Sequence, residues 1–230
     1  MIPLEANPPV FRSYLERIDP NTKLDFEDVY ILEPLPGAPQ PLALICLFSL
    51  NDQIMKRYQT LPPAVAERKP AQKGSRTERE SENSGQAVKD TQEQDRPVWF
   101  TRQFEKNACG PVAIMHAVMN IARPDLIDCD KLAEFAGNFQ SGSQAANCDL
   151  AHAGQTKPPV NLDDVSEHFV AFIPNDGHLY ELDGRMNGPI DHGPCDDDNW
   201  TQAAFETIQN TIVNMDPNNY RFVVMALTHH

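Results

Sequence analysis

The stretch His168-Phe-Val-Ala-Phe-Ile-Pro-Asn-Asp-Gly-His-Leu-Tyr-Glu-Leu-Asp183 contains two apolar segments on either side of a short turn signal. Runs rich in Val, Ile, Phe and Tyr are typical of strands, and an Asp-Gly pair between two such runs is typical of a hairpin. We therefore expect His168–Ile173 and His178–Asp183 to pair as antiparallel strands of a central sheet.

The length of the turn decides which residues face each other across this hairpin. If the loop is the four residues Pro174–Gly177, His168 lies directly opposite Asp183. If Asp176 and Gly177 alone form a two-residue turn, Asp183 pairs with Val170 and lies diagonal to His168, in a looser contact. In either register both side chains share one face of the sheet, so the carboxylate can accept a hydrogen bond from the imidazole.

The rest of the chain mixes helical and strand patterns. Such a mixture favours helices packed around a central sheet, an α/β fold. We expect helices at Val10–Ile18, from Asn107 to before Pro124, at Asp130–Phe139 and at Trp200–Val213, and strands at Leu24–Leu32, Leu42–Leu50 and Tyr220–Leu227.

A length of 230 residues fits one large domain or two small ones. Residues 62–96 have almost no bulky apolar side chains and many Pro, Glu, Lys, Arg, Ser and Gln. Such a segment cannot bury enough surface to offset the entropy of ordering it, so we expect a flexible insertion there.

Composition also limits the classes of partner and compartment. The net charge of −14 disfavours nucleic acid and anionic membranes and would attract a basic partner, although acidic residues also serve solubility alone. The sequence contains no apolar run of the ~18 residues that span a bilayer, and its start does not resemble a signal peptide. Five cysteines without regular spacing suggest a reducing compartment, the cytoplasm or the nucleus.

Cys109 is the candidate nucleophile. Pro111 is tolerated only in a first helical turn, so it places Cys109 at a helix start, with Asn107 as a reasonable cap. The positive end of the helix dipole there favours the thiolate. The alternative is a small inert core residue, which is the usual place of a free cysteine. Cys46 lies in an apolar strand, and Cys129, Cys148 and Cys195 show no helix-start pattern.

Several ordered motifs lie along the chain. They are Gln103-Phe-Glu-Lys-Asn-Ala-Cys-Gly110, Ile114-Met-His-Ala-Val-Met-Asn120, His168-Phe-Val-Ala-Phe172, Asp176-Gly-His-Leu-Tyr-Glu-Leu-Asp-Gly-Arg185, Pro189-Ile-Asp-His-Gly193, Pro3-Leu-Glu-Ala-Asn-Pro8, Asp28-Val-Tyr30, Cys46-Leu-Phe48 and His152-Ala-Gly-Gln-Thr156. Together they resemble the motifs of the ubiquitin C-terminal hydrolase (UCH) family, and they are closest to its small single-domain members.

The resemblance implies a role for each matching position. Cys109 matches the nucleophile, His168 the general base, Asp183 the acid that orients it, and Gln103 a donor to the oxyanion hole. Leu4, Glu5 and Asp28 match positions near the surface that binds ubiquitin.

The same resemblance implies the fold and the reaction. The fold would be a single catalytic domain over residues 1–230, a papain-like α/β/α sandwich with a mostly antiparallel central sheet and a knotted backbone. The activity would be that of a deubiquitinating thiol protease that releases adducts or peptides from the terminal glycine of ubiquitin or of NEDD8, without a metal or cofactor.

Two alternatives remain open. The segment Asn138–Leu150 is shorter than the family pattern, which leaves room for a ubiquitin-binding pseudoenzyme or a defective splice form. A zinc protein using Cys148, His152, His192 and Cys195 is the other, although their spacing does not match a recurrent structural zinc pattern.

Overall fold

A computed structural model describes residues 3–35, 37–60, 97–121, 123–140, 166–216 and 222–230. Its centre is a six-stranded sheet in the order β1-β6-β2-β3-β4-β5, and all five strand pairings are antiparallel. The strands are β1 (Leu24–Val29), β2 (Ala43–Ser49), β3 (Glu167–Asn175), β4 (His178–Leu182), β5 (Ile190–Pro194) and β6 (Phe222–His229).

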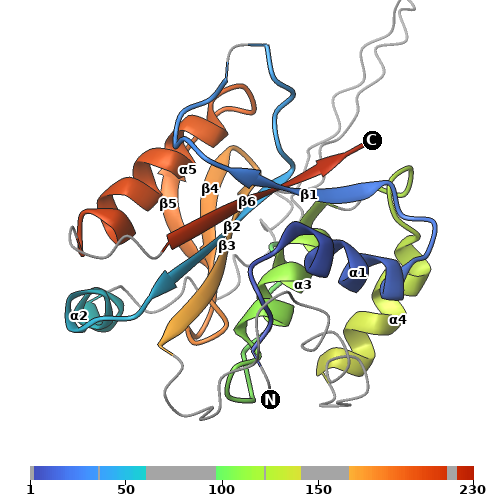
Figure 1. Cartoon of the computed structure of the whole chain (residues 1–230), viewed down its shortest axis with the longest axis horizontal. Coiled ribbons are helices and arrows are strands. Elements are labelled where there is room, and N and C mark those ends of the chain that lie inside the picture. The colour runs from blue at the N-terminus through green and yellow to red at the C-terminus, as the bar shows by residue number, and fades with distance from the viewer. Residues whose placement is uncertain (1–2, 36, 61–96, 122, 141–165, 217–221) are drawn as a thin grey trace, which may run out of the picture.

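Helices cover both faces of this sheet, as the α/β/α expectation requires (Figure 1). Alternate residues along each central strand feed two separate apolar cores. One core lies under α1 (Pro8–Ile18), α3 (Cys109–Ile121) and α4 (Cys129–Gln140). The other lies under α2 (Asp52–Thr60) and α5 (Trp200–Ile208), which continues as the π-helical turn η3 (Gln209–Val213).

The hairpin forms with the two-residue turn. Asn175 pairs with His178, and Asp176 and Gly177 both have positive φ, 48° and 70°. These are the conformations of a type I′ turn, which matches the twist of the strands. The four-residue loop is therefore wrong, because Asp-Gly tolerates the left-handed conformations and leaves Pro174 and Asn175 free to pair within β3.

Other boundaries differ where the sequence signal is weak. The strand expected over Leu24–Leu32 ends at Val29, where its pairing with β6 ends. The elements α2 and β5 were not predicted, because α2 follows β2 directly and β5 contains Gly193 and Pro194. The expected insertion at 62–96 lies outside the described residues, and the knot depends on backbone that includes such segments, so both stay predictions.

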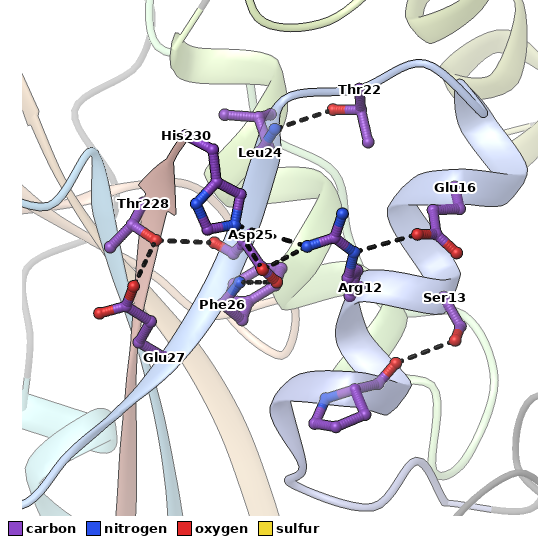
Figure 2. A network of polar contacts seen from close by, with 11 residues as sticks. Arg12, Ser13, Glu16, Thr22, Leu24, Asp25, Phe26, Glu27, Thr228 and His230 are labelled. Carbon is purple, nitrogen blue, oxygen red and sulfur yellow. Dashed lines mark hydrogen bonds and ion pairs between the residues drawn. The ribbon is translucent and has the colours of Figure 1, made fainter.

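A polar cluster joins α1 to the edge strand β1 and to His230, which directly follows the neighbouring strand β6 (Figure 2). Asp25 of β1 accepts hydrogen bonds from the Arg12 guanidinium of α1 and from Nε2 of His230, which lies 2.8 Å from its carboxylate. Arg12 also binds Glu16 one turn along its own helix, at 3.0 Å.

None of the helices in the described ranges has the length and apolar character that crossing a bilayer requires.

Candidate active site

Helix α3 begins at Cys109, as the position of Pro111 predicts. The Ala108 carbonyl accepts the Val112 N–H at 3.0 Å, which closes the first turn. Pro111 has no N–H to lose there, so it fits the first turn without cost. Asn107 precedes that turn in a left-handed conformation with φ 63°, which asparagine tolerates better than most residues. The Cys109 side chain is consequently held at the start of the helix, 6% exposed.

Helix-start placement is not unique to Cys109, and the expectation that Cys129 lacks it is wrong. Cys129 is the first residue of α4, and Asp128 caps that helix by accepting the N–H groups of Asp130 and Lys131. Cys129 is exposed, and its Sγ lies 3.7 Å from the Ile127 carbonyl. What separates the two thiols is therefore the imidazole beside Cys109.

His168 is carried to Cys109 by the start of β3. It is 2% exposed, and its ring meets Phe48 of β2 edge to face, with centroids 5.9 Å apart. Its Nε2 lies 2.7 Å from Asp183 Oδ1. Although the diagonal register predicted a looser contact, the bond is direct. Since Nε2 is used by Asp183, Nδ1 is the ring nitrogen left for the thiol.

Asp183 stands just after β4 and is fully buried. Its Oδ1 accepts two hydrogen bonds, one from His168 and one from the backbone N–H of Arg185 at 2.8 Å. Its Oδ2 is buried and makes no hydrogen bond with the described residues. The acid is thus fixed by one oxygen, and the other oxygen faces the interior.

The electrostatics favour a thiolate–imidazolium pair. Burial opposes the thiolate, but the hydrogen bond and charge of His168, with the backbone N–H groups of Phe169 and Gly110, lower the pKa of Cys109. Burial also disfavours the imidazolium, but Asp183 and Cys109 outweigh it and raise the pKa of His168 to about 9. Each member therefore stabilises the charged form of the other.

Gln103, Asp183 and α3 meet around a single glycine. The Gln103 N–H donates to the Gly184 carbonyl at 2.7 Å, and a Cβ on Gly184 would lie 2.7 Å from Val112 Cγ1 of α3. The Gln103 side chain donates through Nε2 to the Glu105 carbonyl at 2.8 Å. An amide nitrogen has two hydrogens, and among the described residues the second hydrogen of Gln103 Nε2 has no acceptor, so it can donate to another group.

The three residues matched to the ubiquitin-binding surface lie in different places. Leu4 packs against the first turn of α3, where its Cβ is 3.0 Å from the point that a Cβ on Gly110 would occupy. Glu5 accepts a hydrogen bond from Asn7 at 3.3 Å. Asp28 is exposed on the edge strand β1 and lines a cavity of about 320 Å³ that none of the catalytic candidates touches.

A second buried carboxylate, Glu181, lies near Asp183 and is not among the site residues that the sequence predicts. Glu181 of β4 is fully buried and binds Arg57 and Tyr58 of α2 and His192 of β5. The available signal was its position two residues before Asp183, which places both side chains on one face of the strand.

No metal site competes with this arrangement among the residues that the structure describes, since no three His, Cys, Asp or Glu side chains gather there as ligands. The zinc alternative named Cys148 and His152, which lie outside the described residues. His192, its third member, binds Glu181 at 2.8 Å instead.

Comparison with known proteins places this geometry in a family. The model of "Ubiquitin carboxyl-terminal hydrolase, family 1" matches residues 1–213. A ubiquitin carboxyl-terminal hydrolase of Drosophila melanogaster is 32% identical over 98% of this chain and 96% of its own length. Isozyme L1 of Rattus norvegicus is 29% identical over the same shares, 98% and 96%.

The fold comparison agrees. The UCH37 catalytic domain of Trichinella spiralis, solved bound to ubiquitin vinyl methyl ester, superposes with a TM-score of 0.66 at 23% identity and covers 100% of this chain and 95% of that one. That likeness shows the papain-like fold. From the family match and the Drosophila relative, the chain belongs to family 1 of the ubiquitin carboxyl-terminal hydrolases, a family of cysteine peptidases.

Proposed function

We propose that this chain hydrolyses the bond that follows the terminal glycine of ubiquitin, with Cys109 as nucleophile, His168 as acid and base, and Asp183 as the residue that orients His168. The single observation that carries the proposal is the buried relay in which Asp183 holds His168 at 2.7 Å while His168 interacts with Cys109 at a helix start. Nucleophile, base and orienting acid are the three parts that thiol hydrolysis needs.

Acylation uses the charges of the resting pair. The Cys109 thiolate attacks the glycine carbonyl carbon, and the imidazolium of His168 gives its proton to the leaving amine or thiolate. The products of this step are a thioester on Cys109 and a neutral imidazole. Asp183 keeps the ring oriented throughout, because its bond to Nε2 leaves Nδ1 toward the reacting atoms.

Deacylation reverses the proton's path. Neutral His168 takes a proton from water as that water attacks the thioester, and the acid of ubiquitin leaves while Cys109 regains its thiolate. In both steps the carbonyl oxygen becomes negative. Two groups are suitable donors to this oxygen. The Gln103 amide has a second hydrogen, and the Cys109 backbone N–H is among the first of its helix, which have no intrahelical acceptor.

Ubiquitin is the partner that the comparisons favour, because the family model and the curated relatives are named for it and a solved relative holds a ubiquitin derivative. NEDD8 is a second candidate, carried only by the resemblance. Its test is the ratio of kcat/KM for matched ubiquitin and NEDD8 substrates.

The decisive experiment replaces the nucleophile. Cys109→Ala should abolish cleavage of a fluorogenic ubiquitin C-terminal amide, whereas Cys129→Ala, which removes another helix-start thiol, should keep wild-type activity. A ubiquitin probe with a C-terminal electrophile should form a covalent adduct at Cys109. Binding of that probe without an adduct supports the pseudoenzyme instead, and activity that survives in Cys109→Ala overturns the assignment.

A further inference from the structure

The side chains behind Asp183 form a closed ionic cluster between α2, β4 and β5. Arg57 holds Glu181 with both of its terminal nitrogens, Nη2 to Oε2 at 2.5 Å and Nη1 to Oε1 at 3.3 Å. His192 Nε2 binds the same Oε2 at 2.8 Å. Tyr58 donates its hydroxyl to Oε1 at 3.2 Å.

Both carboxylate oxygens of Glu181 have hydrogen-bond donors other than Tyr58. Without Tyr58, both of its oxygens still have a nitrogen donor from a side chain that can carry positive charge. Burial disfavours the ionised carboxylate, but His192 and Arg57 more than offset this and lower the pKa of Glu181 to about 2. The Tyr58 hydroxyl is therefore a surplus donor at Glu181.

Asp183, in contrast, has fewer hydrogen-bond donors within the described part of the chain than its two oxygens can use. Its Oδ1 accepts two hydrogen bonds, but its Oδ2 is buried with no partner among the described residues. An unpaired buried carboxylate oxygen carries a substantial desolvation cost. The hydroxyl that reaches Glu181 Oε1 also lies near the Asp183 carboxylate, which, after burial and the charge of Glu181, raises the pKa of Tyr58 through both its own charge and its side-chain interaction with the hydroxyl.

We propose that Tyr58 is a positioning residue for Asp183, and that its hydroxyl turns between Glu181 Oε1 and Asp183 Oδ2 in the free enzyme as well as with substrate bound. The structure holds the donor in place through Arg57, whose guanidinium carbon lies 5.2 Å from the Tyr58 ring centroid and binds Glu181. A phenolic hydrogen has two favoured orientations in the plane of its ring, so the donor can change its acceptor by rotation about one bond. This inference rests on the role given to Asp183 in the proposed function.

Tyr58 stays a donor over the whole working pH range. Burial, followed by the charges of Glu181 and Asp183, raises the pKa of Tyr58 well above its ordinary value. The other charged or titratable groups around this region are Arg57 on α2, Glu181 on β4, His192 on β5, His168 on β3, and Cys109 and His116 on α3.

A hydrogen bond from Tyr58 would set how strongly the Asp183 carboxylate stabilises the protonated ring of His168. A donor on Oδ2 compensates part of the carboxylate charge. In Tyr58→Phe the full charge acts on His168, so its imidazolium becomes more stable and a weaker acid. Amide cleavage, which needs that proton for the leaving amine, slows; thioester cleavage, whose thiolate leaves readily, does not.

The first test needs no ubiquitin. The rate of alkylation of Cys109 by iodoacetamide is followed against pH in wild type, in Tyr58→Phe and in Tyr14→Phe, which removes a buried hydroxyl from α1 on the other side of the sheet. In Tyr58→Phe the midpoint for thiolate formation should fall by roughly half a unit, part of what one hydrogen bond to a charged group supplies. Tyr14→Phe should keep the wild-type midpoint.

The second test compares leaving groups. In Tyr58→Phe, kcat/KM should fall about 3- to 10-fold for a ubiquitin amide and stay within about twofold for a ubiquitin thioester. An unchanged midpoint, or an equal loss on both substrates, overturns the proposal and leaves Tyr58 a purely structural role. If the wild-type chain cleaves no ubiquitin substrate, the proposed function fails, while the alkylation midpoint still decides the role of Tyr58.

Discussion

At the scale of single residues, two cysteines separate the effect of a helix start from the effect of an imidazole. Cys109 and Cys129 each begin a helix, so each feels the positive end of a helix dipole. Only Cys109 interacts with His168, and that interaction lowers its pKa against the effect of burial. The side chain of Cys129 is exposed, whereas that of Cys109 is nearly enclosed.

We expect the enclosed thiol to react first. At mildly acidic pH, iodoacetamide should modify Cys109 several-fold faster than the exposed Cys129, because the thiolate is the reactive form. Peptide mass spectrometry after brief labelling measures both sites in one sample. In His168→Asn the order should reverse, since exposure then decides. Faster labelling of Cys129 in the wild-type chain would show that His168 does not sustain the Cys109 thiolate.

At the scale of elements, the end of the hairpin and the first turn of α3 contact each other through Gly184. In Gly184→Ala, the new Cβ would lie 2.7 Å from Val112 Cγ1 and 3.1 Å from the backbone nitrogen of Gln103. The chain segment around Gln103 or the helix must shift, at a cost of about 1–3 kcal/mol for overpacking. Because the Gly184 carbonyl holds Gln103, kcat should fall as well as stability.

Gly137 in α4 offers the matched control. A Cβ there meets nothing within 4 Å, so Gly137→Ala should raise the free energy of unfolding by about 0.5–1 kcal/mol through helix propensity. Urea unfolding and hydrolysis of the fluorogenic amide measure both variants. A Gly184→Ala variant with wild-type stability and kcat would mean that the hairpin and α3 are not tightly packed there.

The elements that the sequence predicts well are those with local signals. Asp176-Gly177 predicts the hairpin, and Pro111 predicts the start of α3 at Cys109. The contact of Glu181 with α2 has no such signal, because Glu181 has the appearance of a solvent-facing residue in an alternating strand. Its burial depends on Arg57, 124 positions away in the chain, and single-sequence periodicity cannot predict such a pairing.

At the scale of the whole molecule, buried titratable groups decide how stability depends on pH. The folded pKa of Glu181, about 2, lies below its ordinary 4.5, so its contribution is present above about pH 4.5 and is lost toward pH 2. Burial, only partly offset by Thr101, Leu182 and Asp183, lowers the pKa of His116 from 6.5 to about 4, so its contribution is lost between those values as pH falls.

The reactive pair acts on the alkaline side of this dependence. A folded pKa of about 9 for His168 means stability that is lost as pH rises from 6.5 to 9. The lowered pKa of Cys109 acts in the opposite sense, because the folded thiol releases its proton at a lower pH than the unfolded one. These two contributions have opposite signs and act on the alkaline side, whereas those of Glu181 and His116 act on the acidic side.

We therefore expect the free energy of unfolding to fall when pH is lowered from about 6 to about 3, and Glu181 to account for part of that loss. Urea unfolding followed by the fluorescence of Trp99 and Trp200 measures it.

Glu181→Gln should be less stable near neutral pH by about 3 kcal/mol, because it leaves Arg57 buried without its partner. It should also lose less than wild type on acidification, since no carboxylate remains at 181 to take up a proton. Glu206→Gln, on the exposed face of α5, should keep the wild-type dependence. An acid loss in Glu181→Gln as large as in wild type would place the acid sensitivity in other carboxylates and remove the link between the cluster behind Asp183 and the stability of the fold.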